Sequence, residues 1–250
     1  MSTSYPLRIN KYLALHNFAT RKGADELIKK GYVFINGRKA VLGDQVYRDG
    51  EVTVSDKVPK KNYVYYAYNK AVGVSTNPDV KSKDILSVTK FPEPLPSPLL
   101  SKDRGNSVFP IGRLDKDSRG LILMTNDGRM TDRLLAPQYV HEKEYVVKVE
   151  PNFSDKFIEL MANGVHFDKF ISRKCKVWKT TSKSKDTFNI ILTEGKKRQI
   201  RRMCEALHHT VINLKRIRVM NIELGKLNEG EYREIKGEEL DTLLKSLQLR

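Results

Sequence analysis

The chain has 250 residues and a mass of 28.7 kDa, enough for one or two folded domains. Hydrophobic residues make up 39% of it, which excludes wholesale disorder, and it has no apolar run of about 18 residues that could span a membrane. Its 46 Lys and Arg against 30 Asp and Glu give a formal net charge of +16, which favours a nucleic-acid partner over simple solubility or a basic membrane-surface protein.

Residues 7–54 are expected to form a small compact unit. Apolar residues at helical spacing predict one helix over residues 9–16 and a second helix from Thr20 to Gly31. A strand at residues 32–35 then leads into Asn36-Gly37, the usual signal of a two-residue hairpin turn, and a strand at residues 51–54 closes a small sheet.

Basic residues dominate the surface of this predicted unit. Residues 1–61 hold twelve Lys and Arg against six Asp and Glu, and most of the helical ones lie off the apolar stripe. A solvated polar face is the simpler interpretation, but charges mostly of one sign suit contact with phosphates. The candidate RNA contacts here are Arg8, Lys11, Arg21, Lys22 and Arg38.

The segment LRINKYLALHNFATRKGADELIKKGYVFINGRKAVLGDQV resembles an S4 domain, a small RNA-binding module. That resemblance implies RNA binding but no chemistry. Residues 55–62 are short, polar and rich in lysine, with Pro59 among them, and we expect them to be a linker.

Residues 63–250 are expected to form one larger α+β domain. Short strand-like runs alternate in it with helical stretches; the strands are expected at residues 63–68, 121–125, 145–149 and 188–193. Lys81–Ser107 contains four prolines and several serines, so we expect a long loop, a type of segment that is often functional.

The stretch GRLDKDSRGLILMTNDG, residues 112–128, is a polar loop followed by an apolar strand, with Gly120 at its entry. Asp115 therefore lies on a loop held by a buried strand, which is a typical place for a reactive group. From the residues alone, an aspartate that merely caps a turn is the favoured interpretation.

This stretch resembles the signature loop of the RsuA-type pseudouridine synthases. The resemblance implies that Asp115 is the catalytic nucleophile, and that Arg113 enters the RNA and helps to hold a flipped nucleotide. It also implies the fold, an α+β domain with a central, mostly antiparallel sheet flanked by helices. The active cleft would cross that sheet.

A second element, HEKEYVVKV at residues 141–149, alternates as a strand should, with Tyr145, Val147 and Val149 on one face. Core packing would explain Tyr145, whereas the resemblance implies that its ring lines the active site and stacks under the target uracil. The histidine-glutamate pair does not open a zinc-binding HExxH motif, because residue 145 is a tyrosine.

The third element is GKKRQIRRMC, residues 195–204, in which Ile200, Met203 and Cys204 make an apolar stripe on a helix. Arg201 lies about 100° from Ile200, at the edge of that stripe. The resemblance implies that Arg201 pairs with Asp115 and that Ile200 packs beside the target base. The remaining basic residues of this element are expected to contact phosphate or to stay solvated: Lys196, Lys197, Arg198 and Arg202.

Four further segments resemble the RluF branch of the family: HEKEYVVKV, RKCKV, GKKRQIRRMCEALHHTVINLKRIRVMNIEL and GEYREI. That resemblance implies isomerisation of uridine in 23S rRNA after base flipping. The alternatives are a synthase for 16S rRNA or tRNA and a ribosome-assembly factor that binds RNA without catalysis. We expect a cytoplasmic monomer that needs no cofactor or metal. The first ten residues lack an apolar signal core, and Cys175 and Cys204 are placed for neither a disulfide scaffold nor a zinc site.

Overall fold

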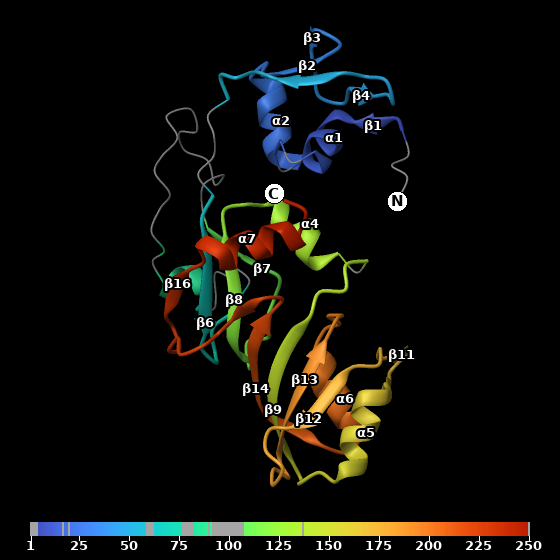
Figure 1. The fold of residues 1–250 in the computed structure, drawn as a ribbon, viewed down its shortest axis with the longest axis vertical. Helices are drawn as coiled ribbons and strands as arrows, with labels where there is room; N and C mark the ends of the chain where they lie inside the picture. The colour runs from blue at the N-terminus through green and yellow to red at the C-terminus, as the bar shows by residue number, and fades with distance from the viewer. Residues whose placement is uncertain are drawn as a thin grey trace.

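The structure is a computed structural model that describes residues 5–16, 18–19, 21–58, 63–76, 83–89, 91, 108–136 and 138–249. The N-terminal unit lies at one end of the long axis, and a large sheet with its helices occupies the rest (Figure 1). Thr20, the predicted start of the second helix, lies outside the described residues, as does the side chain of Lys22.

The N-terminal unit contains two helices and two small sheets. Its helices are α1 (Ile9–Leu15) and α2 (Arg21–Lys29). Strand β1 (Leu7–Arg8) pairs with β4 (Gln45–Val46), and a three-stranded sheet has the order β3 (Arg38–Lys39), β2 (Val33–Ile35), β5 (Val52–Val54). Its hydrophobic core draws only on residues of this unit, among them Ile9, Leu13, Ala24, Ile28 and Val33.

The predicted hairpin between β2 and β3 is confirmed. Ile35 pairs with Arg38, which leaves only Asn36 and Gly37 in the turn, and both have positive φ, 49° and 78°. A type I′ turn requires positive φ at both central residues, and asparagine followed by glycine tolerates that conformation best.

The rest of the chain is built on a nine-stranded sheet with five helices among the described residues. Its main strand order is β12 (Lys176–Lys179), β13 (Thr187–Leu192), β9 (Lys143–Glu150), β14 (Thr210–Val219), β8 (Arg119–Thr125), β6 (Tyr65–Lys70), β16 (Tyr232–Glu234). In addition, β15 (Ile222–Glu223) pairs with β14 and β7 (Phe109–Ile111) with β8, and a separate hairpin joins β10 (His166–Phe167) to β11 (Phe170–Ile171). The helices are α3 (Ile85–Val88), α4 (Arg129–Leu135), α5 (Asp155–Asn163), α6 (Gln199–Ala206) and α7 (Gly237–Ser246).

One parallel pairing joins two antiparallel halves of this sheet. Strand β14 runs antiparallel to β9 but parallel to β8, where Arg216 pairs with Gly120. Gly120 has φ +106°, and a Cβ atom there would lie 2.2 Å from the carbonyl oxygen of Arg216. Only glycine allows this close approach of two backbones, which brings the loop before β8 beside β14.

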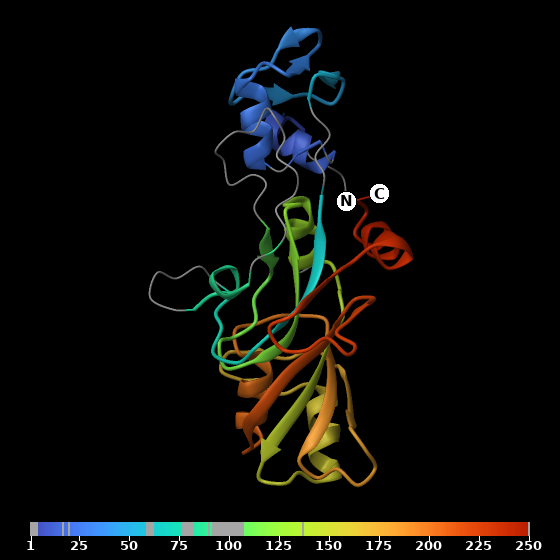
Figure 2. The same ribbon diagram turned by 90° about the vertical axis from the view of Figure 1, so that its left-hand side faces the viewer.

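Two groups of helices cover the sheet (Figures 1 and 2). Helices α5 and α6 lie at the end far from the N-terminal unit, where their apolar residues share one core with β9 and β13. Helices α4 and α7 lie nearer that unit and pack on β6 and β8. The expected α+β fold with a mostly antiparallel sheet flanked by helices is therefore confirmed.

The burial of individual strands explains why the sequence predicted them. On β9, Tyr145, Val147 and Val149 are buried while Lys148 and Glu150 are exposed, so one face contacts the core. On β8 the residues 121–124 are all buried, because helices and loops cover both faces, and the strand reads as a continuous apolar run. The four predicted strands of this part are confirmed as β6, β8, β9 and β13, within a few residues at their ends.

The predicted loop Lys81–Ser107 is interrupted by helix α3. The side chain of Asp84 accepts a hydrogen bond from the backbone N–H of Ser87, and the Ser87 hydroxyl accepts one from the backbone N–H of Asp84, which starts this short helix. Most of the predicted loop, residues 81–82, 90 and 92–107, lies outside the described residues.

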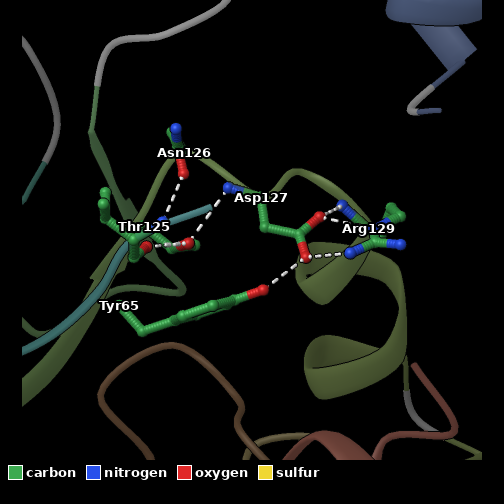
Figure 3. Close-up of polar contacts among 6 residues, drawn as sticks. Tyr65, Thr125, Asn126, Asp127 and Arg129 are labelled. Atoms are coloured by element: carbon green, nitrogen blue, oxygen red, sulfur yellow. Dashed lines mark hydrogen bonds and ion pairs between the residues drawn. The ribbon is translucent and has the colours of Figure 1, made fainter. Parts of the chain in front are cut away.

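A buried polar network holds the far end of β8 against β6 (Figure 3). Asp127 is fully buried and accepts hydrogen bonds from Tyr65 Oη at 2.9 Å and from Arg129 Nε and Nη2 at 2.8 and 2.7 Å. Thr125 Oγ1 donates to Val64 O at 2.5 Å. Because each charge is paired, the network fixes the strand that carries the polar loop at its other end.

Candidate active site

A cleft of about 620 Å³ opens where the polar loop before β8 meets β9, β14 and the start of α6. Its walls are strongly basic, because eight Lys and Arg side chains line it against two acidic ones, Asp115 and Glu194. The basic lining residues are Arg113, Lys116, Lys143, Arg173, Lys196, Lys197, Arg198 and Arg216. Such a concentration of one sign suits a polyanion.

The loop that carries Asp115 is held by backbone contacts on several sides. The N–H of Ser118 donates to the carbonyl of Asp115 at 3.0 Å and closes a tight turn. The N–H of Gly73 donates to the carbonyl of Lys116 at 2.8 Å, and Thr76 Oγ1 donates to the carbonyl of Leu114 at 3.4 Å. The loop is therefore preorganised, as a reactive side chain requires.

Lys70 supports the same loop from beneath. Its side chain is fully buried, and its ammonium donates to the carbonyls of Ala71 and Val74 at 2.8 Å each, with Lys116 O at 3.5 Å. Burial lowers its pKa to about 8, although Asp117 and Asp115 act in the opposite direction. Lys70 was not among the residues predicted from the sequence, although a lysine at the end of the otherwise uncharged strand β6 was a visible signal.

The structure brings Asp115, Tyr145 and Ile200 to one cleft, although they come from a loop, a strand and a helix. Asp115 is half-buried, and in the described part of the chain its carboxylate has no ion pair or hydrogen bond from a side chain. Tyr145 and Ile200 are 9% and 4% exposed and present apolar surface to the cleft. The geometry combines an unpaired carboxylate with an aromatic ring and an aliphatic side chain.

Arg201 differs from the expected arrangement. Its predicted place at the edge of the apolar stripe of α6 is confirmed, since the side chain is 13% exposed while Ile200, Met203 and Cys204 are buried. The guanidinium, however, contacts Asp117 rather than Asp115: Nη2 donates to Asp117 O at 2.9 Å, and Nε lies 3.3 Å from Oδ2. The expected pairing with Asp115 is therefore wrong for this structure.

The reason lies in the tight turn after Asp115. That turn places the backbone carbonyl and the carboxylate of Asp117 toward α6, and Arg201 spans from there to Ser118 Oγ and to Val211 O at 3.3 and 3.0 Å. Burial lowers the pKa of the Arg201 guanidinium, and the charge of Asp117 opposes that shift. Arg201 thus joins the loop to β14 and holds it in place.

Arg198 and Arg202 were expected to contact phosphate or to remain solvated. Both form ion pairs in the structure, and their contact with phosphate stays a prediction. Arg198 Nη2 lies 2.9 Å from Asp117 Oδ2, and its backbone has φ +52°, a left-handed conformation just before α6. Partial burial would raise the pKa of Asp117, but Arg198 and Arg201 hold it below its usual value. Arg202 pairs with Asp168 and lies over the ring of Phe167.

The basic residues proposed for the N-terminal unit divide into two groups. Arg8, Lys11 and Arg21 are exposed. Arg38 is also exposed, but its guanidinium forms a double hydrogen bond with the carboxylate of Asp44 at 2.8 and 3.1 Å. Since that carboxylate already engages Arg38, the first three are the better candidates for contact with phosphates.

The cysteines carry no sign of reactivity. Cys204 is buried and Cys175 is partly buried, and burial raises their pKa values to about 12 and about 11. In the described ranges, no three His, Cys, Asp or Glu side chains are grouped to hold a metal ion. Nor does any helix there have the length and apolar character needed to cross a membrane.

Comparisons with known proteins point to one chemistry. Residues 64–206 match the family described as RNA pseudouridylate synthase. The chain is 38% identical to the dual-specificity RNA pseudouridine synthase RluF of Salmonella typhi, over 99% of this chain and 82% of that protein. It is 35% identical to ribosomal large subunit pseudouridine synthase B of Bacillus subtilis, over 94% of this chain and 95% of that one. A crystal structure of a pseudouridylate synthase matches with a TM-score of 0.65 at 26% identity, covering 96% and 99% of the two chains.

Proposed function

The chain belongs to the RNA pseudouridylate synthase family and is an RNA pseudouridine synthase; from that premise we propose that it isomerises specific uridines of 23S rRNA, with Asp115 as its nucleophile. The proposal of 23S rRNA as the substrate is supported by the relative that is named for the large ribosomal subunit. Because another relative is described as having dual specificity, a second RNA, such as tRNA, is the alternative substrate of this protein.

The reaction changes connectivity without changing composition. The bond between N1 of uracil and C1′ of ribose breaks, the base turns while it stays bound, and a bond forms between C5 and C1′. The hydrogen on C5 leaves as a proton, and N1 gains one. A carboxylate can start this by attack on the sugar or on the base, or by removal of a sugar proton, and we assign this role to Asp115.

The observation that carries this proposal is the state of Asp115. It is half-buried in a basic cleft, and in the described structure no cation is bound directly to its carboxylate. Asp117, two residues later, is already engaged by Arg198 and Arg201. An unengaged carboxylate in a cleft that Tyr145 and Ile200 also line is available to a substrate, whereas an engaged one is not.

Each neighbour of Asp115 then has its own role in the proposal. Tyr145 and Ile200 hold the uracil ring between apolar surfaces while it turns. Arg201 and Arg198 act as positioning residues, because they fix Asp117 and with it the turn that carries Asp115. Arg113, exposed at the rim of the cleft, is suited to hold the RNA from which the nucleotide has flipped.

The N-terminal unit is proposed to bind RNA in the manner of an S4 domain, with residues 7–54 as the domain, residues 55–62 as the linker and residues 63–250 as the catalytic domain. Its separate hydrophobic core and its exposed Arg8, Lys11 and Arg21 support this division. Contacts of these residues with phosphates would add affinity without adding chemistry.

Mapping of pseudouridines in a deletion strain tests the substrate. Pseudouridines in 23S rRNA, 16S rRNA and tRNA are mapped in the parent strain, in the deletion strain, and in the deletion strain that expresses either the wild-type gene or Asp115→Asn. We expect one or more sites in 23S rRNA to disappear and to return only with the wild-type gene. Loss confined to 16S rRNA or tRNA would contradict the 23S proposal, and unchanged maps of all three would point to a factor that binds RNA without modifying it.

A further inference from the structure

Two further basic residues lie beside Tyr145 on the face of the sheet that lines the cleft. Arg216 of β14 is the direct cross-strand partner of Tyr145 of β9, and Lys143 lies two residues before Tyr145 on the same strand. Directly paired residues, and residues two apart on a strand, share a face of the sheet. All three side chains accordingly line the same cleft.

Neither cation has a counter-charge in the described structure. Arg216 uses Nε to hold Leu121 O at 2.6 Å, and Lys143 Nζ reaches only His141 O at 3.4 Å. Arg218, on the same strand, is different, because it binds the carboxylates of both Glu142 and Glu144. Arg218 is thus paired with two carboxylates, whereas neither Arg216 nor Lys143 forms an ion pair among the described residues.

The burial of these two residues makes the arrangement unfavourable without an anion. Arg216 is 5% exposed, and Lys143 is partly buried close to it. Burial, and then the charge of Arg216, lower the pKa of Lys143. Of the two acids that line the cleft, Glu194 is bound to Gln199 and to Arg173, and Asp115 forms no ion pair with Lys143 or Arg216 among the described residues. Two like charges that share a partly desolvated wall attract an anion strongly.

We propose that Lys143 and Arg216 form a phosphodiester-binding subsite that holds the backbone of the nucleotide whose base lies against Tyr145. This inference rests on the proposed function, because it takes RNA as the occupant of the cleft. A phosphate bound here would tie the flipped nucleotide by its backbone while the base is free to turn. The fixed backbone is what an isomerisation with a detached base requires.

The test uses an RNA hairpin on which the wild-type protein forms pseudouridine, prepared in three forms. One has all its phosphates, and the other two carry a neutral methylphosphonate on the 5′ or the 3′ side of the target uridine. Dissociation constants are measured at one fixed salt concentration, since every phosphate contact depends on salt. The proteins are the wild type, Lys143→Met, Lys143→Arg, and Lys148→Met as the matched control on the exposed face of β9.

We expect one of the two methylphosphonates to weaken binding to the wild type by about tenfold or more, as loss of a charge-assisted contact should. Lys148→Met and Lys143→Arg should keep that sensitivity. Lys143→Met should bind the unmodified RNA more weakly and lose most of the sensitivity. Far-ultraviolet circular dichroism confirms that each variant is folded, and Lys143→Gln replaces Lys143→Met if that variant is not.

Two results would overturn the subsite. In the first, each methylphosphonate changes the dissociation constant of the wild type by less than about twofold. In the second, a methylphosphonate weakens binding to Lys143→Met as much as it weakens binding to the wild type. Both leave the proposed function intact if the wild type still forms pseudouridine. Failure of the wild type to modify any rRNA or tRNA would instead overturn the proposed function itself.

Discussion

Arg201 Nη2 donates a hydrogen bond of 2.9 Å to the backbone carbonyl of Asp117, two residues after Asp115. The same guanidinium reaches Val211 O at 3.0 Å, so a single side chain joins the loop to β14. This geometry makes Arg201 a positioning residue, because it sets where Asp115 stands through the turn rather than through direct contact with that carboxylate.

Arg201→Lys should therefore reduce turnover although it keeps the charge. A lysine ammonium cannot span Asp117, Ser118 and Val211 as a planar guanidinium does, and a small displacement of a reactive group costs about a hundredfold in rate. The measurement is the single-turnover rate at saturating RNA. Arg202→Lys is the matched control on the same helix, and its rate should stay within about threefold of the wild type. Equal rates for Arg201→Lys and the wild type would show that this bridge is not needed.

Lys70 should make the stability of the protein depend on pH. Its pKa is 10.5 in an ordinary lysine and about 8 in the folded protein, so the unfolded chain binds more protons between these values and rising pH favours the folded state. Below about pH 8 both states are protonated and this contribution is constant. Relative to Lys70→Met, the wild-type free energy of unfolding should rise by up to about 3 kcal/mol from pH 8 to pH 10.5. Denaturant unfolding of both proteins across that range measures it, and a constant difference would contradict the assignment.

Gly120→Ala should destabilise the fold strongly. The new Cβ atom would meet the carbonyl of Arg216 at 2.2 Å in a backbone with φ +106°, so β8 and β14 would have to separate. We expect a loss of more than about 4 kcal/mol. Gly230→Ala is the control. Gly230 has φ +83°, but a Cβ atom there would have no neighbour within 4 Å, so the substitution should cost only about 1–2 kcal/mol. Thermal unfolding distinguishes the two, and similar losses would show that the close approach is unimportant.

The network in Figure 3 predicts a different kind of loss. Asp127→Asn should destabilise the protein by about 3–5 kcal/mol, because it leaves the partly buried Arg129 without its carboxylate. Tyr65→Phe removes a single hydrogen bond to Asp127 and should cost about 1.5–3 kcal/mol. Chemical denaturation of both variants gives the comparison. A loss for Tyr65→Phe as large as that for Asp127→Asn would mean that the ion pair is not the main element of the network.

The sequence was sufficient to predict four of the nine strands of the large sheet, because their burial leaves simple patterns, but it did not predict β14, the longest of them. Strand β9 alternates between the core and solvent, β8 is buried on both faces, and Asn36-Gly37 carries the backbone preference of its turn. The cleft residues Asp115, Tyr145 and Ile200 came from a family resemblance together with these patterns. None of the three patterns depends on contacts between distant parts of the chain.

The ion pairs could not be predicted in the same way, because they depend on how distant segments meet. Helical spacing placed Arg201 at the edge of the stripe, but the turn at residues 115–118 decides whether its partner is Asp115 or Asp117. Lys143 and Arg216 become neighbours only through the register of β9 and β14. Charge counting along the sequence carries no information on either relationship.

The most direct test of the central claim compares Asp115→Asn with Asp117→Asn, two isosteric changes in one turn. The single-turnover rate of pseudouridine formation is measured at saturating RNA, together with the dissociation constant of each variant. We predict no detectable product with Asp115→Asn and RNA binding within about tenfold of the wild type, because phosphate contacts dominate affinity. Asp117→Asn should be slower than the wild type but active, since Arg201 still binds the backbone carbonyl of residue 117. Substantial product from Asp115→Asn, or the complete loss of product from Asp117→Asn alone, would contradict the assignment of Asp115 as the nucleophile.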